Sequence, residues 1–359
     1  MNHTNNAIYL NTAACGLIPE AAVQAGNSFN TALQINSSIR AADWKASEAN
    51  RIRNTIAHFI GAPEQNVAMM PNFSFAINCL VQSLKGTERI LLFRKDFPSL
   101  TDPFKINNFD ITWIDTTDEF TISLEEINSL IETQKIDIVA ISHVQWSSGL
   151  AMDLKELGAL CKQHGARLII DGTQSLGAIP VNLSALPVDV FIASNYKWMN
   201  AGFGTGILYI TDDFLKKYPP VVAGNNSYVL QNGQLTYRPS MRSYEPGHLN
   251  MSGLLLLEAA IQDKNNRGME AIAAHNKKLT QLFLEGIKGL PVQLIGPSSM
   301  GNRSSIIFLK DKNGLGEWLK KHQIIVTHRD GNIRISIHYY NSEADINALV
   351  DCIRQLPAV

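Results

Sequence analysis

The chain has 359 residues, of which 45% are hydrophobic and 18% charged, and these proportions exclude a disordered, collagen-like or disulfide-stapled protein. Its 31 basic residues nearly balance its 32 acidic residues, so the composition carries no electrostatic signal for binding nucleic acid or an anionic membrane. The four cysteines are scattered, with no C-x-x-C pair and no His at metal-finger spacing, which favours reduced thiols and predicts no metal site.

The sequence also favours a cytoplasmic location. The best apolar run, Leu254–Leu257, meets Glu258 at once and falls far short of a membrane span. No Lys or Arg precedes Arg40, which argues against a cationic signal or transit peptide. We therefore expect a cytoplasmic protein without a membrane segment.

Between residues 50 and 210, short β-branched runs alternate with amphipathic stretches. The expected strands are Asn66–Met70, Arg89–Phe93, Asp110–Asp115, Ile136–Ser142, Arg167–Asp171, Asp189–Ala193 and Gly206–Thr211. Helical patterns between them include Phe73–Leu84, Leu124–Glu132 and Leu154–His164. This alternation predicts an α/β unit with a mostly parallel sheet covered by helices on both faces.

The last third of the chain has a different pattern. Residues Tyr218–Asn250 are rich in Asn, Gly, Pro and Ser and predict long loops, which are often functional. The elements expected after them are a long helix over Ser252–Gly289, strand Ser304–Leu309, helix Gly314–His322, strand Asn332–His338 and helix Ser342–Leu356. We therefore expect a large domain over residues 16–250 and a small α+β C-terminal domain that consists of residues 251–359 together with residues 1–15.

Parallel α/β sheets bind ligands at the carboxyl ends of their strands, so the residues that follow each strand are the candidates for chemistry. Phe73 and Ser74 open the helix after the first strand, where backbone N–H groups and a hydroxyl suit a phosphate. A serine at a helix start is also commonly a plain N-cap.

Asp171 ends an otherwise apolar strand, where a carboxylate is costly to bury without a cationic partner. Lys197 follows the next strand, beside Tyr196 and Trp198, and precedes a glycine-rich loop. A lysine in such a crevice, near aromatic residues and an acid, is a candidate for Schiff-base chemistry. Spacing alone equally allows a surface lysine beside a solvated carboxylate.

Seven motifs, in a fixed order, cover nearly the whole chain. They are Tyr9–Ala14, Asp96–Ser99, Ile141–Trp146, Asp171–Gln174, Ser194–Lys197, Tyr244–Asn250 and Ile333–Asn341. Together they resemble the class V aminotransferase and cysteine desulfurase-like family of pyridoxal 5′-phosphate (PLP) enzymes. The resemblance implies the PLP-dependent transferase fold of type I. That fold has a large domain with a mostly parallel seven-stranded sheet flanked by helices, and a small α+β C-terminal domain.

The resemblance also implies roles around the cofactor ring. Lys197 matches the residue that forms the internal aldimine with PLP and later moves the α-proton. Asp171 matches the acid that keeps the pyridine nitrogen protonated, which makes the ring an electron sink. Gln174 matches the residue that hydrogen-bonds the ring hydroxyl. Phe97 stands where the family stacks an aromatic ring on the cofactor, with a core phenylalanine as the alternative.

Phosphate binding maps by resemblance to four residues of the same chain, Phe73, Ser74, Ser194 and Tyr196. Tyr196 stands where many relatives have His, and both side chains can donate a hydrogen bond. A residue of the turn containing His248 reaches the phosphate of the partner subunit in the family. Relatives often carry Thr at that place. The resemblance thus implies a homodimer with active sites at the subunit interface.

Substrate binding maps by resemblance to the small domain and the N-terminal motif. Arg334 matches the residue that clamps the α-carboxylate, for which a planar guanidinium is suited; a salt bridge within the small domain is the alternative. Trp146 stands where desulfurases commonly have Asn, and it either shapes the pocket for an apolar or aromatic substrate or simply walls the site. The resemblance also places Asn11 and Ala14 beside the substrate. Arg329 either helps Arg334 to bind the carboxylate or is exposed to solvent.

Cysteine desulfurases carry a catalytic cysteine on a mobile loop ahead of the strand with the carboxylate-binding arginine. Here residues Ile325–Asn332 contain no Cys and lead almost directly to Arg334. Cys352 lies beyond that strand and is interpreted as a buried apolar residue. Cys15 lies in the N-terminal motif, where it is either a thiol near the substrate or a packed residue. A desulfurase that forms a persulfide on its own cysteine is therefore disfavoured.

The leading hypothesis is a PLP-dependent enzyme that acts on an amino acid substrate as a class V aminotransferase. The alternatives are a C–S lyase or cysteine desulfurase-like enzyme, an epimerase, and a non-catalytic binding protein that keeps the fold. The joint presence of Lys197, Asp171, Gln174 and Arg334 argues against the binding protein. A nicotinamide-dependent dehydrogenase is excluded because no G-x-G-x-x-G motif follows an early strand.

Overall fold

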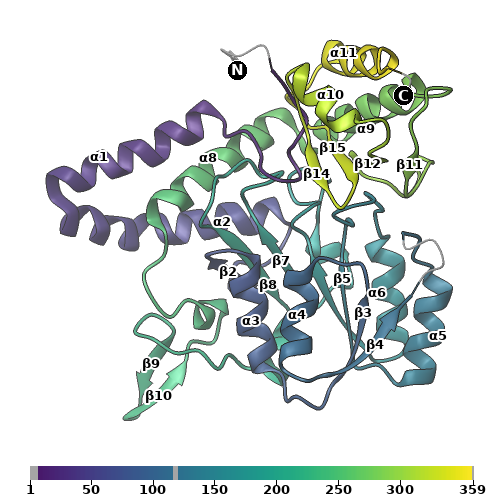
Figure 1. The fold of residues 1–359 in the computed structure, drawn as a ribbon. Coiled ribbons are helices and arrows are strands. Elements are labelled where there is room, and N and C mark those ends of the chain that lie inside the picture. Colours follow the sequence, from purple (N-terminus) through teal and green to yellow (C-terminus); the bar gives the residue numbers. More distant parts are fainter. Residues whose placement is uncertain (1–6, 116–119, 358–359) are drawn as a thin grey trace.

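The computed structural model describes residues 7–115 and 120–357 and has a seven-stranded central sheet in its larger unit (Figure 1). The strand order is β2-β8-β7-β6-β5-β3-β4. The strands are β2 (Val67–Met70), β3 (Arg89–Phe93), β4 (Asp110–Ile114), β5 (Ile138–Ser142), β6 (Arg167–Asp171), β7 (Val190–Ser194) and β8 (Gly206–Ile210). Only β8 runs antiparallel to its neighbours. The predicted mostly parallel sheet is confirmed.

Helices cover both faces of this sheet because its strands are apolar on both sides. Alternate residues of β3 belong to different cores: Leu91 and Phe93 pack in one, Ile90 and Leu92 in the other. The helices of this unit are α1 (Glu20–Asp43), α2 (Ala49–Phe59), α3 (Phe73–Ser83), α4 (Pro98–Ile106), α5 (Leu124–Gln134), α6 (Leu154–Gln163), α7 (Asp212–Lys217) and α8 (Met251–Arg267). Figure 1 shows α3 and α4 side by side on one face.

Helix α1 has no counterpart among the predicted elements. It projects from the sheet and packs along α8 (Figure 1). Its buried residues are Ala22, Gly26 and Phe29, a narrow apolar stripe in a segment otherwise rich in Asn, Ser and Gln. A π-helical turn, Trp44–Glu48, joins α1 to α2 and buries Trp44. The weak apolar periodicity explains why sequence patterning missed this helix.

The smaller unit has its own four-stranded antiparallel sheet and its own apolar core. The sheet order is β11 (Leu294–Ile295), β12 (Ile306–Lys310), β15 (Asn332–Ser336) and β14 (Thr327–Arg329), and the helices are α9 (Met269–Gly286), α10 (Leu315–Lys321) and α11 (Glu343–Arg354). The N-terminal strand β1 (Ile8–Tyr9) pairs in parallel with β13 (Ile324–Ile325) of this unit. The predicted α/β fold with a small α+β unit is confirmed.

Two predicted elements differ from the structure. The expected helix over Ser252–Gly289 is two helices, α8 and α9, because Gly268 between them has a φ of 79° that ends α8. The expected loops over Tyr218–Asn250 contain the hairpin β9 (Tyr228–Gln231) and β10 (Gln234–Tyr237) and a 3₁₀ turn.

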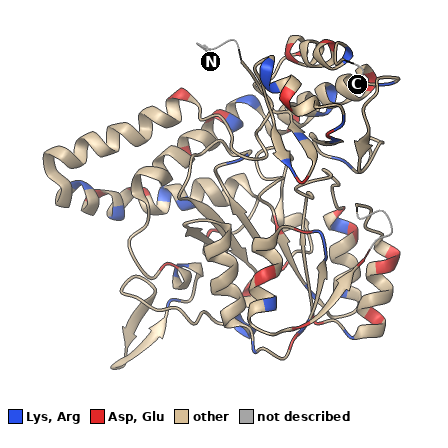
Figure 2. Ribbon diagram, in the orientation of Figure 1, with Lys and Arg blue, Asp and Glu red and all other residues tan. Residues whose placement is uncertain are grey.

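The predicted domain division at residues 250 and 251 stays a prediction. The apolar side chains of α8 pack in the core of the large unit, whereas those of α9 pack in the core of the small unit. No helix within the described residues has the length and apolarity needed to cross a membrane. Basic and acidic residues are interspersed over both units (Figure 2).

Candidate active site

A cavity of about 230 Å³ lies at the carboxyl ends of β5, β6 and β7, where ligands of such sheets bind. Nine residues predicted for the site line it, namely Phe73, Ser74, Phe97, Trp146, Asp171, Gln174, Ser194, Tyr196 and Lys197. Ser99, Ser142 and Thr173 line it as well and were not predicted. The fold thus gathers the predicted cofactor-binding residues of this chain, apart from His248, around one cavity.

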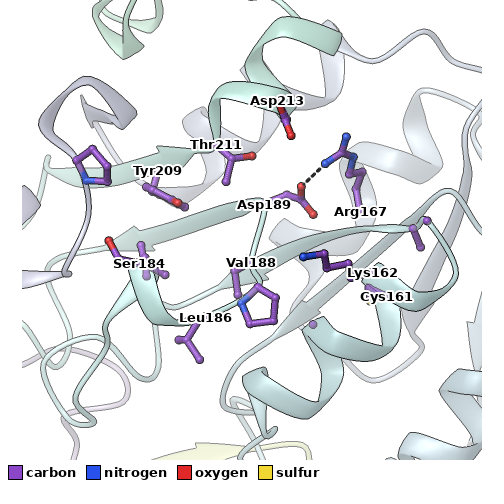
Figure 3. A pocket seen from close by; sticks show the side chains of 16 residues that line it. Cys161, Lys162, Arg167, Ser184, Leu186, Val188, Asp189, Tyr209, Thr211 and Asp213 are labelled. Carbon is purple, nitrogen blue, oxygen red and sulfur yellow. Dashed lines mark hydrogen bonds and ion pairs between the residues drawn. The ribbon is translucent and has the colours of Figure 1, made fainter.

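A larger hollow of about 630 Å³ lies at the opposite edge of the sheet, where β6 and β7 begin and β8 ends (Figure 3). Two of its charged side chains bind each other, since Arg167 Nη1 lies 2.7 Å from Asp189 Oδ1. Burial raises the pKa of Cys161, which also lines the hollow, to about 12, so this thiol is not a nucleophile. The smaller cavity is therefore the candidate active site.

Asp171 and Lys197 form the charged centre of the cavity and are 5% and 7% exposed. Burial raises the pKa of Asp171 to about 6, opposed by its hydrogen bonds from Thr173 and by the charge of Lys197. Burial lowers the pKa of Lys197 to about 8, opposed by Asp171 and assisted by Arg334 and Arg329. A lysine with such a pKa supplies a neutral, nucleophilic amine close to neutral pH.

The turn that carries Lys197 is held by tight backbone packing. The N–H of Gly16 donates to the carbonyl of Tyr196 at 2.8 Å, and the N–H of Asn200 donates to the carbonyl of Lys197 at 3.0 Å. A Cβ on Gly16 would lie 2.0 Å from the Lys197 carbonyl oxygen. Glycine at position 16 is therefore required for the N-terminal segment to lie against the lysine.

The amide of Gln174 is bound at both ends within the chain. Its Oε1 accepts a hydrogen bond from Trp198 Nε1 at 2.7 Å, and its Nε2 donates to the carbonyl of Ala13 at 3.1 Å. An Nε2 group has a second hydrogen, which stays available for an acceptor in the cavity. These bonds fix the orientation of the amide, and they connect the cavity to the residue after Lys197.

One wall of the cavity is the amino end of α3. Asn72, not Ser74, is the N-cap, because its side chain accepts from the N–H of Phe75 at 2.8 Å. The N–H of Phe73 donates to Ser194 Oγ at 2.8 Å, and Ser74 Oγ donates to Ser99 Oγ at 3.1 Å. A helix start surrounded by hydroxyl groups has the chemistry of a phosphate site.

Arg334 on β15 reaches the same region from the small unit and is 6% exposed. Its Nη1 donates to the carbonyl of Trp146 at 3.0 Å, and Nη2 donates to Thr327 Oγ1 at 3.4 Å. Its Nε has no hydrogen-bond partner, and no carboxylate of residues 7–115 or 120–357 forms an ion pair with it. The alternative of a salt bridge within the small domain is therefore wrong within the described residues, and the guanidinium fits a carboxylate ligand.

Trp146 is half-buried between the two units. Its ring meets Phe97 edge-on, with centroids 5.9 Å apart, and its Nε1 donates to the carbonyl of Lys95 at 3.1 Å. The guanidinium carbon of Arg329 lies 4.4 Å from the centroid of the Trp146 ring, and that of Arg334 lies 5.9 Å away. Trp146 thus walls the cavity and packs against both arginines.

Besides Arg334, three predicted site residues lie outside the cavity lining. Asn11 accepts a hydrogen bond from Thr327 Oγ1 and forms a bridge with Ser336, so it supports the strand that carries Arg334. Ala14 is half-buried in the turn beside Asn11. His248 is exposed, with its Nε2 2.6 Å from Lys45 Nζ. Its contact with a partner subunit stays a prediction.

The structure adds a buried carboxylate that the sequence reading did not assign, Asp96. It accepts from the N–H of Phe97 at 2.7 Å and from the N–H and hydroxyl of Ser142, and Gln145 donates to it at 3.1 Å. Burial raises the pKa of Asp96. The sequence feature that could have revealed Asp96 is its position directly before Phe97 and Pro98, where α4 begins.

The residues present fit PLP. A buried carboxylate, Asp171, suits a protonated ring nitrogen, and a lysine of lowered pKa suits the aldehyde. The helix start and hydroxyls of Ser74, Ser99 and Ser194 suit the phosphate. Arg334 keeps an unpartnered nitrogen in a buried setting, as a carboxylate site does before its ligand binds.

Comparison with known proteins decides the family. Residues 8–349 match the family described as Aminotransferase class-V. The chain belongs to this family. The "Probable cysteine desulfurase" of Pyrococcus abyssi (strain GE5 / Orsay) is 24% identical to it over 98% of this chain and 95% of that protein.

Solved structures show that the chain shares its fold with enzymes of known structure. The cystine C–S lyase C-DES in complex with its product cysteine persulfide matches with a TM-score of 0.88 and 21% identity, over 98% of each chain. A variant of C-DES with glycine covalently linked to its PLP cofactor matches with the same score and identity, over 98% of this chain and 97% of that one. The predicted family, fold type and PLP cofactor are thereby confirmed.

Proposed function

We propose that this member of the class V family is a PLP-dependent C–S lyase that eliminates the sulfur substituent from the β-carbon of a sulfur-containing amino acid. The names of its relatives support C–S chemistry, since they include cysteine desulfurases and a cystine C–S lyase. Amino-group transfer, the leading hypothesis from the sequence, is supported by the description of the family and by one relative named as an uncharacterized aminotransferase, but more of the relatives are named for C–S chemistry. No observation favours an epimerase.

The observation that carries the proposal is the short hairpin in front of Arg334. Strand β14 ends at Arg329, the turn consists of Asp330 and Gly331, and β15 begins at Asn332. Gly331 has a φ of 68° and Asp330 a φ of 51°, as a two-residue hairpin turn requires. This turn leaves no loop that presents a cysteine to the cavity.

The four cysteines support the same conclusion. Cys79, Cys161 and Cys352 are buried, and none of the four lines the cavity. Cys15 is half-buried, and burial raises the pKa of its thiol, which disfavours the thiolate needed for sulfur transfer. A mechanism in which the substrate loses its sulfur by elimination needs no protein thiol.

The residues of the chain then have distinct tasks. Arg334 binds and orients the α-carboxylate. When bound, PLP supplies an aldehyde that condenses with amines and a ring that accepts the electron pair left by a departing proton. Lys197 takes the α-proton as a neutral amine, and Asp171 holds a proton at the ring nitrogen. Phe97 and Trp146 exclude water from one wall of the cavity.

The balanced reaction for cysteine consumes one water and yields pyruvate, ammonia and hydrogen sulfide. The electron pair from the broken Cα–H bond forms a Cα–Cβ double bond as the sulfur leaves with the pair of the Cβ–S bond. No oxidant or reductant is needed. The homodimer with shared active sites and the cytoplasmic location stay predictions.

The proposal is tested with the purified, PLP-loaded protein and L-cystine or L-cysteine as substrate. Cys15→Ser should keep the rate of sulfur release within about twofold, because the thiol takes no part. Lys197→Ala should lower that rate by a factor of roughly a thousand or more, since it removes the base that takes the α-proton. Loss of sulfur release in Cys15→Ser, with PLP still bound, would instead establish a cysteine-dependent desulfurase.

A further inference from the structure

A buried polar cluster connects the small unit to the turn after Lys197, outside the cavity described above. Its members are Lys264 on α8, Asn276 on α9, His338 just beyond β15, and Trp198 and Asn200 in the turn. All five side chains are at most 3% exposed. The cluster therefore joins four separate segments of the chain by hydrogen bonds inside the core.

His338 is the centre of the cluster, and its bonds define its tautomer. Its Nε2 lies 3.0 Å from the carbonyl oxygen of Trp198 and 3.0 Å from Asn200 Oδ1, which are both acceptors. Its Nδ1 lies 3.3 Å from Asn276 Nδ2, a donor. The imidazole is therefore neutral, with its hydrogen on Nε2. Burial lowers the pKa of His338 well below its ordinary value, with a further contribution from Lys264.

Lys264 has an unusual environment for a lysine with no exposed surface. Its Nζ donates to Asn200 Oδ1 at 2.9 Å and lies 3.3 Å from Nε2 of His338. The ring centroid of Tyr339 lies 4.6 Å away. Within the described residues no carboxylate lies at ion-pair distance from Nζ, and burial lowers the pKa of Lys264 to about 7. A buried lysine without an acid is costly, so a function must retain it.

Two charged residues near Lys264 shift its pKa without touching its amine. Asp263 raises the pKa of Lys264 and Arg267 lowers it, both less than burial does. These two residues bind each other at 3.0 Å, and Tyr339 donates its hydroxyl to Asp263 at 3.1 Å. His275 faces the cluster from α9 and lowers the pKa of His338. The amine of Lys264 therefore donates its hydrogen bond to the amide oxygen of Asn200 and not to a carboxylate.

The cluster reaches the cavity through the turn. The carbonyl of Trp198 accepts from His338, while its indole Nε1 donates to Gln174 in the cavity. Gly177, with a φ of 92°, packs on the same carbonyl, where a Cβ would lie 2.5 Å from the oxygen. Asn200, bound by Lys264, donates its N–H to the carbonyl of Lys197. Trp198 and Asn200, the first and third residues after Lys197, are therefore held from the side opposite the cavity.

We propose that Lys264 and His338 are positioning residues that hold the Trp198–Asn200 turn and thereby fix Lys197 and Gln174 in the cofactor cavity. Neither side chain touches the cavity. They act through the carbonyl of Trp198 and the side chain of Asn200. Without these bonds the turn relaxes, water reaches Lys197, and the desolvation that lowers the pKa of its amine is lost.

The test compares apolar and amide replacements in the full-length protein. Lys264→Met and His338→Leu remove the donors, whereas Lys264→Gln and His338→Gln keep an N–H of similar reach. Lys278→Met is the matched control, a lysine on α9 whose side chain is 70% exposed. Two quantities are measured without turnover. They are the dissociation constant of PLP from cofactor-stripped protein and the pH midpoint for carbamylation of Lys197 by cyanate, read by mass spectrometry.

We expect the apolar variants to raise the PLP dissociation constant about tenfold, the effect of losing one hydrogen bond. The carbamylation midpoint of Lys197 should move upward from about 8 toward its ordinary value. The amide variants and the control should stay near the parent protein on both measures.

The proposal is overturned if the apolar variants unfold more easily yet keep both the parent affinity for PLP and the parent midpoint. It is also overturned if the amide variants are as impaired as the apolar ones. If an apolar variant fails to fold, Asn276→Leu is used in its place. This substitution removes only the donor to Nδ1 of His338, and we expect the same results from it.

Discussion

Lys197 lines the cavity, and Arg334 of the small unit binds the carbonyl of Trp146 in the cavity wall. Each of the two side chains is buried in a setting that works against its charge. Burial lowers the pKa of Arg334 to about 10 and that of Lys197 to about 8. The two lowered pKa values have different consequences at neutral pH. The arginine still carries its charge at neutral pH and keeps a nitrogen without a partner, which suits a carboxylate, while the lysine has a neutral fraction with the chemistry of a nucleophile and base.

Replacing Arg334 with lysine should therefore impair substrate binding although the charge is kept. A lysine cannot form two parallel bonds to a carboxylate and cannot at the same time donate to Trp146 and Thr327. We expect KM for the sulfur amino acid to rise roughly ten- to hundredfold, the effect of hydrogen bonds to charged groups. The control is Arg329→Lys, on a side chain that is 43% exposed, for which KM should change less than threefold. Equal effects in the two variants would contradict this role for Arg334.

At the scale of residues, the sequence predicts charged groups at strand ends well. Asp171 and Lys197 stand out because an acid or a lysine after an apolar strand has few structural explanations. Ser142 and Thr173 were missed because hydroxyl residues are common after strands, and only the fold shows that they face the cavity. The cluster of Lys264 and His338 was also missed, because its members are 74 residues apart and share no motif.

At the scale of elements, an ion pair between Arg53 on α2 and Glu245 fixes the segment before α8. The two side chains are 4% and 6% exposed and form two hydrogen bonds, of 2.6 and 2.8 Å. Glu245 Oε1 also accepts from the N–H of Met69 on β2 at 2.8 Å. The pair therefore ties a helix, a strand and a loop together where water is excluded.

Breaking this pair should be strongly destabilising. Arg53→Met leaves a buried carboxylate without its cation, and we expect it to lower the free energy of unfolding by about 3–5 kcal/mol, measured by urea denaturation. The exposed pair of Arg354 and Asp351 provides the control, because Arg354→Gln should lower it by less than about 1 kcal/mol. The double variant Arg53→Met/Glu245→Leu should recover part of the loss. A single variant as stable as the control would show that the pair is not a buried interaction.

Elements were predictable where the apolar pattern was strong. The strands of the central sheet are nearly continuous apolar runs and were found within a few residues of their true bounds. The division between α8 and α9 was missed because apolar residues continue on both sides of Gly268, and a glycine within a helical pattern does not by itself announce a break. The antiparallel direction of β8 was not foreseen, because direction depends on the connection from β7 and not on composition.

At the scale of the whole molecule, two sets of hydrogen bonds connect the small unit to the segments that pack around Lys197. The carbonyl of Leu10 accepts from the N–H of Ser336, and the hydroxyl of Ser336 accepts from the N–H of Ala13 at 2.9 Å. Lys264 and His338 make a second connection behind the lysine. The small unit thus carries Arg334 and also supports the turn of the large unit that carries Lys197.

This second connection predicts a pH dependence of stability. Burial lowers the pKa of Lys264 from 10.5 to about 7 in the folded protein, so the unfolded chain binds an additional proton between these pH values. The stability of the parent protein relative to Lys264→Met should therefore fall as the pH is lowered from about 10 to about 7, and level off below that. Unfolding of both proteins by urea across this range measures the difference. A difference that does not change with pH would show that Lys264 is not desolvated.

The carbon product formed from L-cysteine by the purified, PLP-loaded protein tests the central claim most directly. A C–S lyase that eliminates sulfur without a protein thiol yields pyruvate and ammonia in equal amounts with sulfide, and this is the predicted result. Alanine as the product would mean that a protein cysteine accepts the sulfur. A keto acid that retains the sulfur would mean amino-group transfer, and either result would contradict the account.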